Sequence, residues 1–314
     1  MALDSNVYLY ASATPDEYGQ SNITPELWAE DIYTRAYKES ILSSLVSLGV
    51  VEQRNDILGR SGHKFTLPKM TLLSAGNLTE GTPTPVSPLE FDGVEVTTRE
   101  RGLATQMSTR SIDVSVSSFE QTVVNAMGGA MAEFLSANLV DELSSASTAA
   151  VYPVVSATRR TAATIEDGDG LTVEQLNEAE TRIRVALNSN RAVAILIHPR
   201  QEKDLRDLSQ FIDASEYGSA GVLLNGEVGR IFGMTVIVSN HVTSALEGTG
   251  SDVPTYKGYV LAQQACVYAP KRPQSFLMGP LDGANLDRAV TLHTWSDYGY
   301  QNFEEAAIVP IKSA

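Results

Sequence analysis

The sequence has few of the residues that enzymes and metal proteins gather into clusters. It holds a single cysteine, Cys266, so it can form neither an intrachain disulfide nor a cysteine-rich zinc site. Its four histidines are scattered, with no His-Glu-x-x-His pair for zinc. There is no Gly-Lys dipeptide of a phosphate-binding loop and no Gly-x-Ser-x-Gly nucleophile elbow. These absences predict a protein that is not an enzyme and that has no catalytic residues, metal site or cofactor.

Charged residues are also scarce, at 19%, and the formal net charge is -15. A protein that reads nucleic acid needs a basic surface to displace counterions from phosphates, so this balance argues against such a function. No apolar stretch approaches the roughly 20 residues that span a bilayer. The start, Met1 to Asp4, has no basic region followed by an apolar run, which indicates no signal peptide. We expect a cytosolic chain without a membrane partner.

Residues 1–23 are rich in Tyr, Ser, Asn and Asp without periodicity, which predicts an arm. A helix start follows at Thr24-Pro25-Glu26, with an N-cap hydroxyl, proline at the first helical position and an acid at the positive end of the helix dipole. Helical spacing of apolar residues continues to about Leu48. Residues 1–40 contain seven acidic and two basic residues, which excludes an arginine-rich RNA-binding arm.

Residues 50–110 predict a hairpin arm that projects from the body. Residues 64–68 alternate like a strand, and a second alternating run begins at Val94 and continues towards Met107. The connection at 74–88 has three prolines and almost nothing to bury, and such long loops are uncommon inside compact domains. An isolated hairpin is marginally stable in water, so this one needs a neighbour to lie on. Residues 54–110 hold seven basic and six acidic residues, so the arm is suited to an acidic neighbour.

A long helix is predicted next. Ser117 and Glu120 form a capping box, and the apolar stripe behind it runs to about Ser147, a length of roughly 45 Å at 1.5 Å per residue. No Lys or Arg lies between Arg110 and Arg159, so this helix carries acids only. Residues 144–170 are rich in Ser, Ala, Thr and Gly and predict a linker.

The last part of the chain predicts an α+β arrangement. A second capping box at Thr172 and Gln175 starts a helix to about Asn188. Strands are expected at 192–197, 230–239, 256–268, 289–295 and 306–311, with a helix at 201–211 and a loop at 213–225.

Four isolated features have ordinary structural interpretations. His198 before Pro199 is read as a strand end, and Cys266 as a small buried residue. The glycines at 226, 229 and 233 lack the dinucleotide-binding spacing and precede a strand, so they predict a turn. The acidic run 166–170 fails the calcium-loop pattern at Leu171 and predicts a polar loop before the second capping box.

The order of several segments carries a family resemblance. They are Phe65-Thr66-Leu67-Pro68-Lys69 leading into Leu78-Thr79-Glu80-Gly81-Thr82-Pro83, then Val94-Glu95-Val96 and the helix from Ser117, then Ile195-Leu196-Ile197-His198-Pro199 with its helix, and 226–239. In this order, over nearly the whole chain, they resemble the major capsid protein of tailed bacteriophages with the HK97-type fold, nearest to the coat proteins of N4-like phages. The resemblance implies an α+β fold with an N-terminal arm, an extended β-hairpin loop, a long spine helix in a peripheral domain, and an α+β axial domain.

The resemblance also implies a function and partners. Copies of the chain would form pentamers and hexamers of an icosahedral shell around double-stranded DNA, assembled in the host cytoplasm and found in the virion. The extended loop would lie over the neighbouring subunit, with intersubunit contacts expected at Lys64, Lys69, Glu80, Arg99 and Arg101. Because the first helix begins by about Thr24, a separate scaffolding protein is expected, beside portal and decoration proteins. Some family members cross-link Lys to Asn, but nothing in this sequence matches that pattern.

The expected segments are 1–49 for the arm and first helix, 50–112 for the extended loop, 113–170 for the spine helix and peripheral domain, 171–285 for the axial domain and 286–314 for the return strands. Two alternatives stay open at this point. One is an encapsulin-like cage that encloses protein cargo, and the other is an α+β enzyme with a long lid loop.

Overall fold

The computed structural model describes residues 41–59, 62–70, 77, 89, 91–108, 119–187, 191–207, 230–248, 252–280 and 289–314. The chain divides into two compact units, which are described separately. The first comprises Met1–Ser40, Gly102–Phe134 and Gln274–Trp295, and the second comprises Ile41–Arg101, Leu135–Pro273 and Ser296–Ala314. The predicted arm at 1–23, the first helix up to residue 40 and the capping Ser117 lie outside the described residues.

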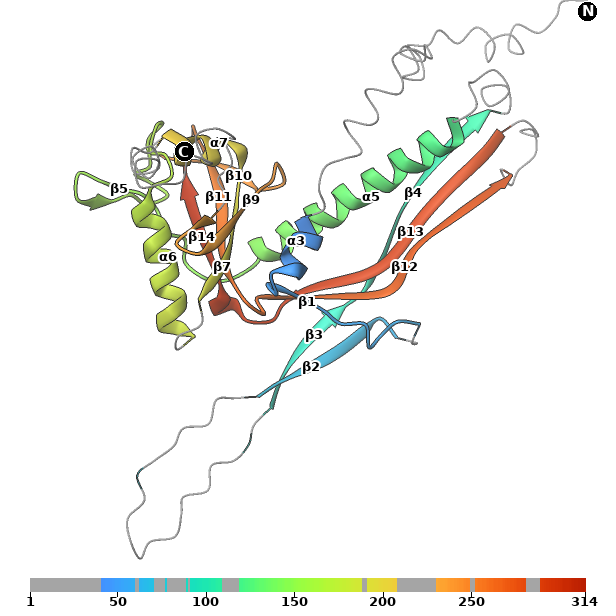
Figure 1. Ribbon diagram of the computed structural model, residues 1–314, viewed down its shortest axis with the longest axis horizontal. Helices are drawn as coiled ribbons and strands as arrows, with labels where there is room; N and C mark the ends of the chain where they lie inside the picture. The colour runs from blue at the N-terminus through green and yellow to red at the C-terminus, as the bar shows by residue number, and fades with distance from the viewer. Residues whose placement is uncertain are drawn as a thin grey trace, which may run out of the picture. The chain divides into compact units, whose positions relative to one another are not determined.

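The second unit is built on a mixed sheet with the strand order β10-β11-β7-β9-β8, and β14 pairs with β11 (Figure 1). Strands β7 and β9 are parallel, whereas β8, β10, β11 and β14 run antiparallel to their partners. The bounds are β7 Ala192–Ile197, β8 Arg230–Ile231, β9 Met234–Val238, β10 Ser244–Glu247, β11 Val253–Ala262 and β14 Ile308–Ser313. Two helices accompany it, α6 Val173–Ala186 and α7 Pro199–Asp207, together with the 3-10 turn η2 Glu305–Ala307.

The central strand β7 forms where the sequence predicted it. Its run of apolar residues is buried almost throughout, which is typical of a strand covered on both faces. Two buried glutamines fasten the edge strand β14 to this core. Gln175 Nε2 donates to the carbonyl of Lys312 at 2.9 Å, and Gln201 Nε2 donates to Ser313 Oγ at 2.9 Å. Because both amides are buried, losing either partner would leave a polar group without compensation for lost water.

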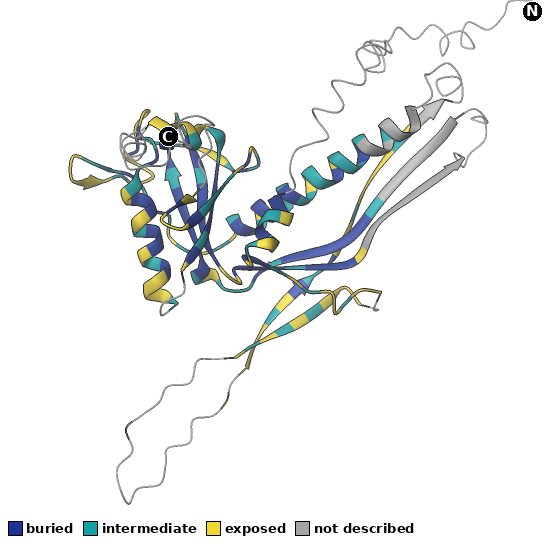
Figure 2. Cartoon of the chain, viewed as in Figure 1, coloured by how far each residue is buried: buried dark blue, intermediate teal, exposed yellow. Residues whose placement is uncertain are grey.

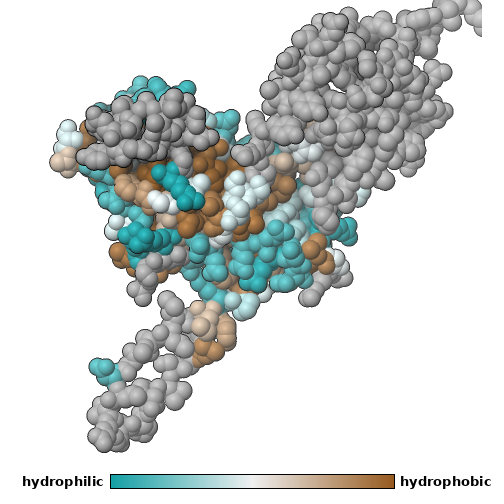
Figure 3. All heavy atoms as spheres, viewed as in Figure 1, coloured by the Kyte–Doolittle hydropathy of each residue, from teal (hydrophilic) through white to brown (hydrophobic). Residues whose placement is uncertain are grey.

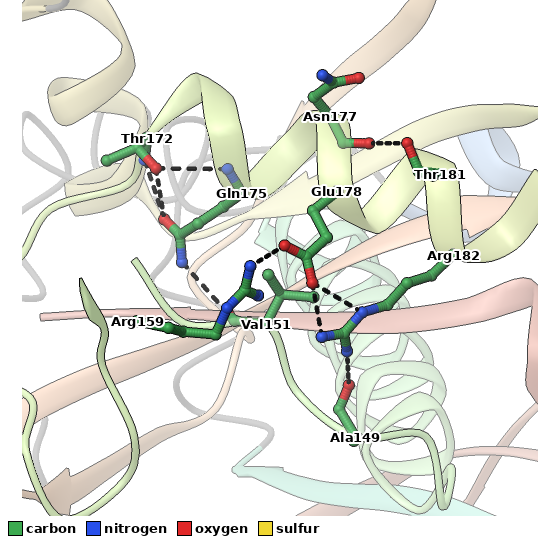
Figure 4. Close-up of polar contacts among 9 residues, drawn as sticks. All are labelled: Ala149, Val151, Arg159, Thr172, Gln175, Asn177, Glu178, Thr181 and Arg182. Atoms are coloured by element: carbon green, nitrogen blue, oxygen red, sulfur yellow. Dashed lines mark hydrogen bonds and ion pairs between the residues drawn. The ribbon is translucent and has the colours of Figure 1, made fainter. Parts of the chain in front are cut away.

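Helix α6 begins with the predicted capping box. The Thr172 hydroxyl accepts from the backbone N–H of Gln175, and the Gln175 side chain accepts from the Thr172 N–H at 2.9 Å (Figure 4). Figure 4 also shows Glu178 between two arginines, Arg159 and Arg182. Arg182 reaches further and donates to the carbonyl of Ala149 at 3.1 Å. The helix therefore holds the segment that precedes it in the chain.

This segment is not the linker that its composition suggested. It forms the small hairpin β5 Val154–Val155 and β6 Thr158–Arg159, and it buries Val151 and Ile165. Val151 also bonds to β14 through Pro310 and Lys312 at 2.8 and 2.9 Å. Small residues do not prevent packing when neighbouring strands and helices supply partners, so composition alone gave the wrong prediction here.

A second sheet has the order β1-β12-β13-β4, with β1 parallel to β12. The bounds are β1 Val51–Gln53, β4 Arg99–Ser108, β12 Cys266–Pro280 and β13 Ala289–Asn302. Helix α3, Ile41–Ser47, precedes β1, and helix α5 spans Phe119–Ser144. The long helix was thus predicted correctly, and it ends three residues earlier than expected.

Three predicted strands each divide into two. The run at 230–239 folds back at Phe232 and Gly233, both with positive φ, to make the hairpin of β8 and β9. The run at 256–268 is interrupted at 263–265, so that β11 belongs to the mixed sheet and β12 to the second sheet. The strand predicted from Val94 towards Met107 also breaks, at Thr98, between β3 and β4.

The predicted hairpin arm consists of β2 Lys64–Met70 and β3 Phe91–Thr97, which among the described strands pair only with each other (Figure 1). The register sets Lys64 opposite Thr97 and Met70 opposite Phe91. Exposed and half-buried residues alternate along β2, as Figure 2 shows. Such alternation means that one face of this two-stranded sheet is partly covered and the other faces solvent.

Candidate assembly surface

The hairpin has two faces of different character. Its inner face carries half-buried or buried side chains, except for exposed Asp92 opposite Lys69: Phe65, Leu67 and Lys69 of β2 with Val94 and Val96 of β3. Its outer face carries exposed residues, except for half-buried Thr97 opposite Lys64: Lys64, Thr66, Pro68 and Met70 with Glu95, Gly93 and Phe91. The outer face is therefore the part of the hairpin that is available to another molecule.

The base of the hairpin is fixed by a close approach of two backbones. A Cβ atom built on Gly299 of β13 would lie 2.5 Å from the carbonyl oxygen of Thr97, closer than real Cβ contacts come. Beside this point Val96 is fully buried, and the N–H of Thr98 donates to the carbonyl of His63 at 2.8 Å. Glycine at 299 thus lets β3 end directly against β13.

Lys69 makes a second connection between the hairpin and the body. Its ammonium lies 2.7 Å from a carboxylate oxygen of Glu304 and 5.8 Å from the centre of the Phe303 ring. About a third of each charged side chain is exposed, so the ion pair is worth at most about 1 kcal/mol. The contact orients the hairpin more than it stabilises the fold.

Arg101 lies on β4, just after the hairpin, and packs on a cluster of three tyrosines, of which Tyr298 and Tyr300 are buried and Tyr268 is half-buried. Its guanidinium is 4.5 Å from the centre of the Tyr298 ring, a cation–π distance. Tyr298 in turn packs against Tyr268 and Tyr300, with ring centres 6.0 and 5.5 Å away. Burial raises the pKa of Tyr298, and the Arg101 charge opposes that rise. Arg101 therefore serves to fix β4 within its own subunit.

The other predicted contact residues differ in their placement. Lys64 is exposed on the outer face, where it forms an ion pair with Glu95 of the facing strand. Arg99 is exposed at the start of β4. Glu80 lies outside the described residues. The structure thus brings Lys64 and Lys69 onto one strand, but on opposite faces of it.

An apolar group at the far end of the hairpin was not predicted from the sequence. Met70, Leu89 and Phe91 are exposed by 53%, 52% and 63% of their surfaces, and Met70 faces Phe91 across the two strands. We call these three residues the apolar end. The short spacing of Leu89 and Phe91 after a polar loop was the available signal, but only the register joins them to Met70.

Three side chains that could have been catalytic or metal-binding residues make structural contacts instead. The His198 ring stacks on Tyr256 at 4.2 Å, and burial, with the nearby Arg200 charge, lowers the pKa of His198. Cys266 is fully buried in β12, and burial raises the pKa of its thiol. Asp169 accepts from the N–H of Glu166 at 2.8 Å and lies 3.0 Å from the Arg160 guanidinium.

Two absences concern the described residues alone. Among them, no three His, Cys, Asp or Glu side chains are grouped so that they could hold a metal ion. In the same part of the chain, no helix is both long and apolar enough to cross a membrane.

Solved capsid structures share this fold. The capsid protein of Ralstonia phage GP4 is 14% identical, with 84% of this chain and 87% of that chain covered at a TM-score of 0.65. The acid-stable capsid of Helicobacter pylori bacteriophage KHP30 is 12% identical, with 88% and 92% covered and a TM-score of 0.65. A chain from Mycobacterium phage Che8 is 14% identical, with 82% and 89% covered and a TM-score of 0.62. The α+β fold is therefore that of HK97-type phage capsid proteins.

Among curated proteins no sequence matches significantly. A family model described as phage capsid protein, however, matches residues 92–311, which is well over half of the chain. This match decides between the interpretations left open by the sequence, because it indicates a phage shell protein and neither an enzyme nor a cargo cage. The chain belongs to the phage capsid protein family and is a structural, non-enzymatic subunit of the virion capsid.

Proposed function

We propose that this chain is the major subunit of an icosahedral phage head, in which pentamers and hexamers enclose double-stranded DNA and the hairpin of each copy lies over the next copy. One observation carries the proposal. Among the described strands the hairpin of β2 and β3 pairs with no other, and its outer face is exposed apart from Thr97 at the base. The inner face of this two-stranded sheet packs on its own subunit, and a neighbouring copy can cover the exposed outer face and stabilise the hairpin further.

The five predicted contact residues divide into two roles in this proposal. Lys64 and Arg99 are exposed and lie where a neighbouring copy can meet them. Lys69 and Arg101 contact their own subunit, and they contribute by holding the hairpin in position. Glu80 belongs to the connection between the two strands, and we retain it as a contact on the strength of the family resemblance.

The charge of the chain fits a container better than a DNA-binding protein. At a formal net charge of -15, copies of the chain repel phosphate, so that the genome is enclosed without being tightly bound. We further propose separate scaffolding, portal and decoration proteins, and a closer relation to the N4-like coat proteins than to other capsid proteins. The five segments, 1–49, 50–112, 113–170, 171–285 and 286–314, are our proposed division into arm, extended loop, spine helix, axial domain and return strands.

Electron microscopy of the expressed chain, alone and co-expressed with a candidate scaffolding protein, tests the proposal. We expect closed shells of uniform size. Nuclease-resistant double-stranded DNA in particles from infected cells distinguishes a genome container from a cage for protein. A chain that stays a small monomer under both conditions would contradict the proposal.

A further inference from the structure

The described residues of the subunit leave the side chains of the apolar end uncovered. Met70 and Phe91 lie opposite each other at the last pair of the β2–β3 register, and Leu89 lies two residues before Phe91. More than half of each side chain is exposed. In Figure 3, apolar atoms gather at this end of the hairpin, beside the grey connection. Large apolar side chains grouped in this way on a projecting element mark a contact surface.

The contacts of the inner face show why the described part of the subunit leaves the apolar end uncovered. Lys69, the neighbour of Met70, points to the inner face and reaches Glu304 and Phe303 of its own chain. Because successive side chains of a strand point to opposite faces, the contact that holds Lys69 inward directs Met70 outward. The same ion pair that positions the hairpin therefore presents Met70 and Phe91 to the outside.

The outer face changes from polar to apolar along its length. At the base Lys64 forms an ion pair with Glu95, so that its charge is already compensated. In the middle Pro68 faces Gly93, a pair with no charge and little side-chain volume. Only at the far end do large apolar groups project. A molecule that docks on this face gains most of its binding free energy at that end.

We infer that the apolar end, Met70, Leu89 and Phe91, is the anchor by which the hairpin of one copy binds a second copy of this chain. The inference rests on the proposed function, because the docking hairpin belongs to that proposal. A second copy is the partner because the chain is a shell subunit and the anchor continues the proposed intersubunit surface. The sequence led us to expect that charged residues make this contact. The anchor predicts instead that burial of apolar side chains supplies most of its binding free energy.

The first test uses the single cysteine of the chain. Cys266 is fully buried and burial raises the pKa of its thiol, so Met70→Cys supplies the one thiol that reacts readily with a maleimide. We expect the thiol at position 70 to react at least about tenfold more slowly in shells than in unassembled subunits. The matched control is Val185→Cys on α6, whose native side chain is 79% exposed, and we expect its rate to stay the same.

The outcomes of this test separate the anchor from the proposed function. Shells in which position 70 reacts as fast as in free subunits would overturn the anchor and leave the shell function intact. Equal protection at position 185 would point to general occlusion by the particle and would also overturn it. If the unmodified chain forms no shells at all, the proposed function itself fails, and the anchor fails with it.

The second test measures the concentration of subunit at which shells form. Phe91→Thr keeps a good strand-forming residue but removes the ring, and we expect it to raise that concentration roughly tenfold to hundredfold. Phe91→Leu, which retains apolar volume, should restore most of the loss. Circular dichroism checks that both variants are folded. Assembly of the Thr variant at the unmodified concentration would refute the role of Phe91.

Discussion

Replacing Gly299 with alanine tests the idea that a backbone contact fixes the hairpin to the subunit. The added Cβ would lie 2.5 Å from the carbonyl oxygen of Thr97 and 3.0 Å from its carbonyl carbon. It would also lie 3.1 Å from a methyl group of Val96, a residue that is fully buried. Two of the three nearest atoms belong to backbone, so no flexible side chain can move aside.

The size of the effect follows from this geometry. To reach an ordinary contact of about 3.5 Å, β3 has to move by roughly 1 Å away from β13. Overpacking of this kind in a buried region costs about 1–3 kcal/mol. The displacement begins at the base of the hairpin, so it also shifts the position of the outer face. We expect Gly299→Ala to lower the free energy of unfolding by about 1–3 kcal/mol and to impair shell formation.

Urea denaturation of the unassembled subunit measures the first effect, and electron microscopy measures the second. Gly128→Ala is the matched control, because a Cβ at this position of helix α5 meets no atom within 4 Å. There alanine should stabilise the helix by up to about 1 kcal/mol. If Gly299→Ala is as stable as the unmodified chain, the two backbones are not held together as the structure has them, and the reasoning is wrong.

Three further outcomes are expected. Ser156 and Ala157 both adopt positive φ, at 51° and 62°, so replacing them with Asn-Gly should raise the free energy of unfolding by about 1 kcal/mol in urea titrations. Burial raises the pKa of Glu142 above its usual value of 4.5, so the unmodified chain loses stability as the pH rises and this carboxyl ionises. Glu142→Gln cannot ionise, and we expect it to be more stable than the unmodified chain at pH 7 but not below pH 4.5, as urea titrations at the two pH values can show. The thiol of Cys266 should resist alkylation until the protein is unfolded, as mass spectrometry can show.

Those parts of the fold that depend on local interactions were predictable. The capping box at Thr172 and Gln175 depends on four consecutive residues, and it forms as the sequence indicated. The apolar run at 192–197 needs only burial on both faces to become a strand, and it does so with the predicted bounds. The long helix at Phe119–Ser144 also forms where it was predicted, although its apolar residues lie all round the helix and not along one stripe.

Places where the chain changes sheets were not predictable. The apolar run at 256–268 contains no proline and only Gly258, which lies inside β11. Its one local break is the polar pair Gln263-Gln264, and polar residues also occur within strands, so this pair does not by itself predict a turn. The chain turns at Gln264, which adopts φ of 58°, a conformation rarely taken by glutamine. The N–H of Gln264 donates to the carbonyl of Gly49 at 3.0 Å, a partner more than 200 residues away. This distant contact holds the turn, so its position could not be read from the neighbouring residues.

The candidate site shows the same division between local and distant information. The hairpin could be predicted because the alternation of apolar and polar residues is a local pattern. The contact residues were chosen by their charge, which the sequence shows directly. It could not show that Lys69 bonds to Glu304, or that Arg101 lies on Tyr298, because these partners lie about 200 residues further along the chain. Nor could it join Met70 to Phe91, since their pairing depends on a register set across an intervening connection of 20 residues.

These contacts fit one physical scheme for assembly. Docking a mobile hairpin would cost conformational entropy for each side chain and backbone segment that becomes ordered. The hairpin is already ordered in the free subunit by Gly299, Lys69 and Arg101. Its conformational entropy is therefore lost during folding and not during assembly. The intersubunit contact then has to supply only the burial of the apolar end, at about 25 cal/mol for each Å² removed from water. In this scheme Lys69 and Arg101 favour assembly through contacts inside their own subunit, Lys64 and Arg99 stay available to the neighbour, and the apolar end supplies most of the binding free energy.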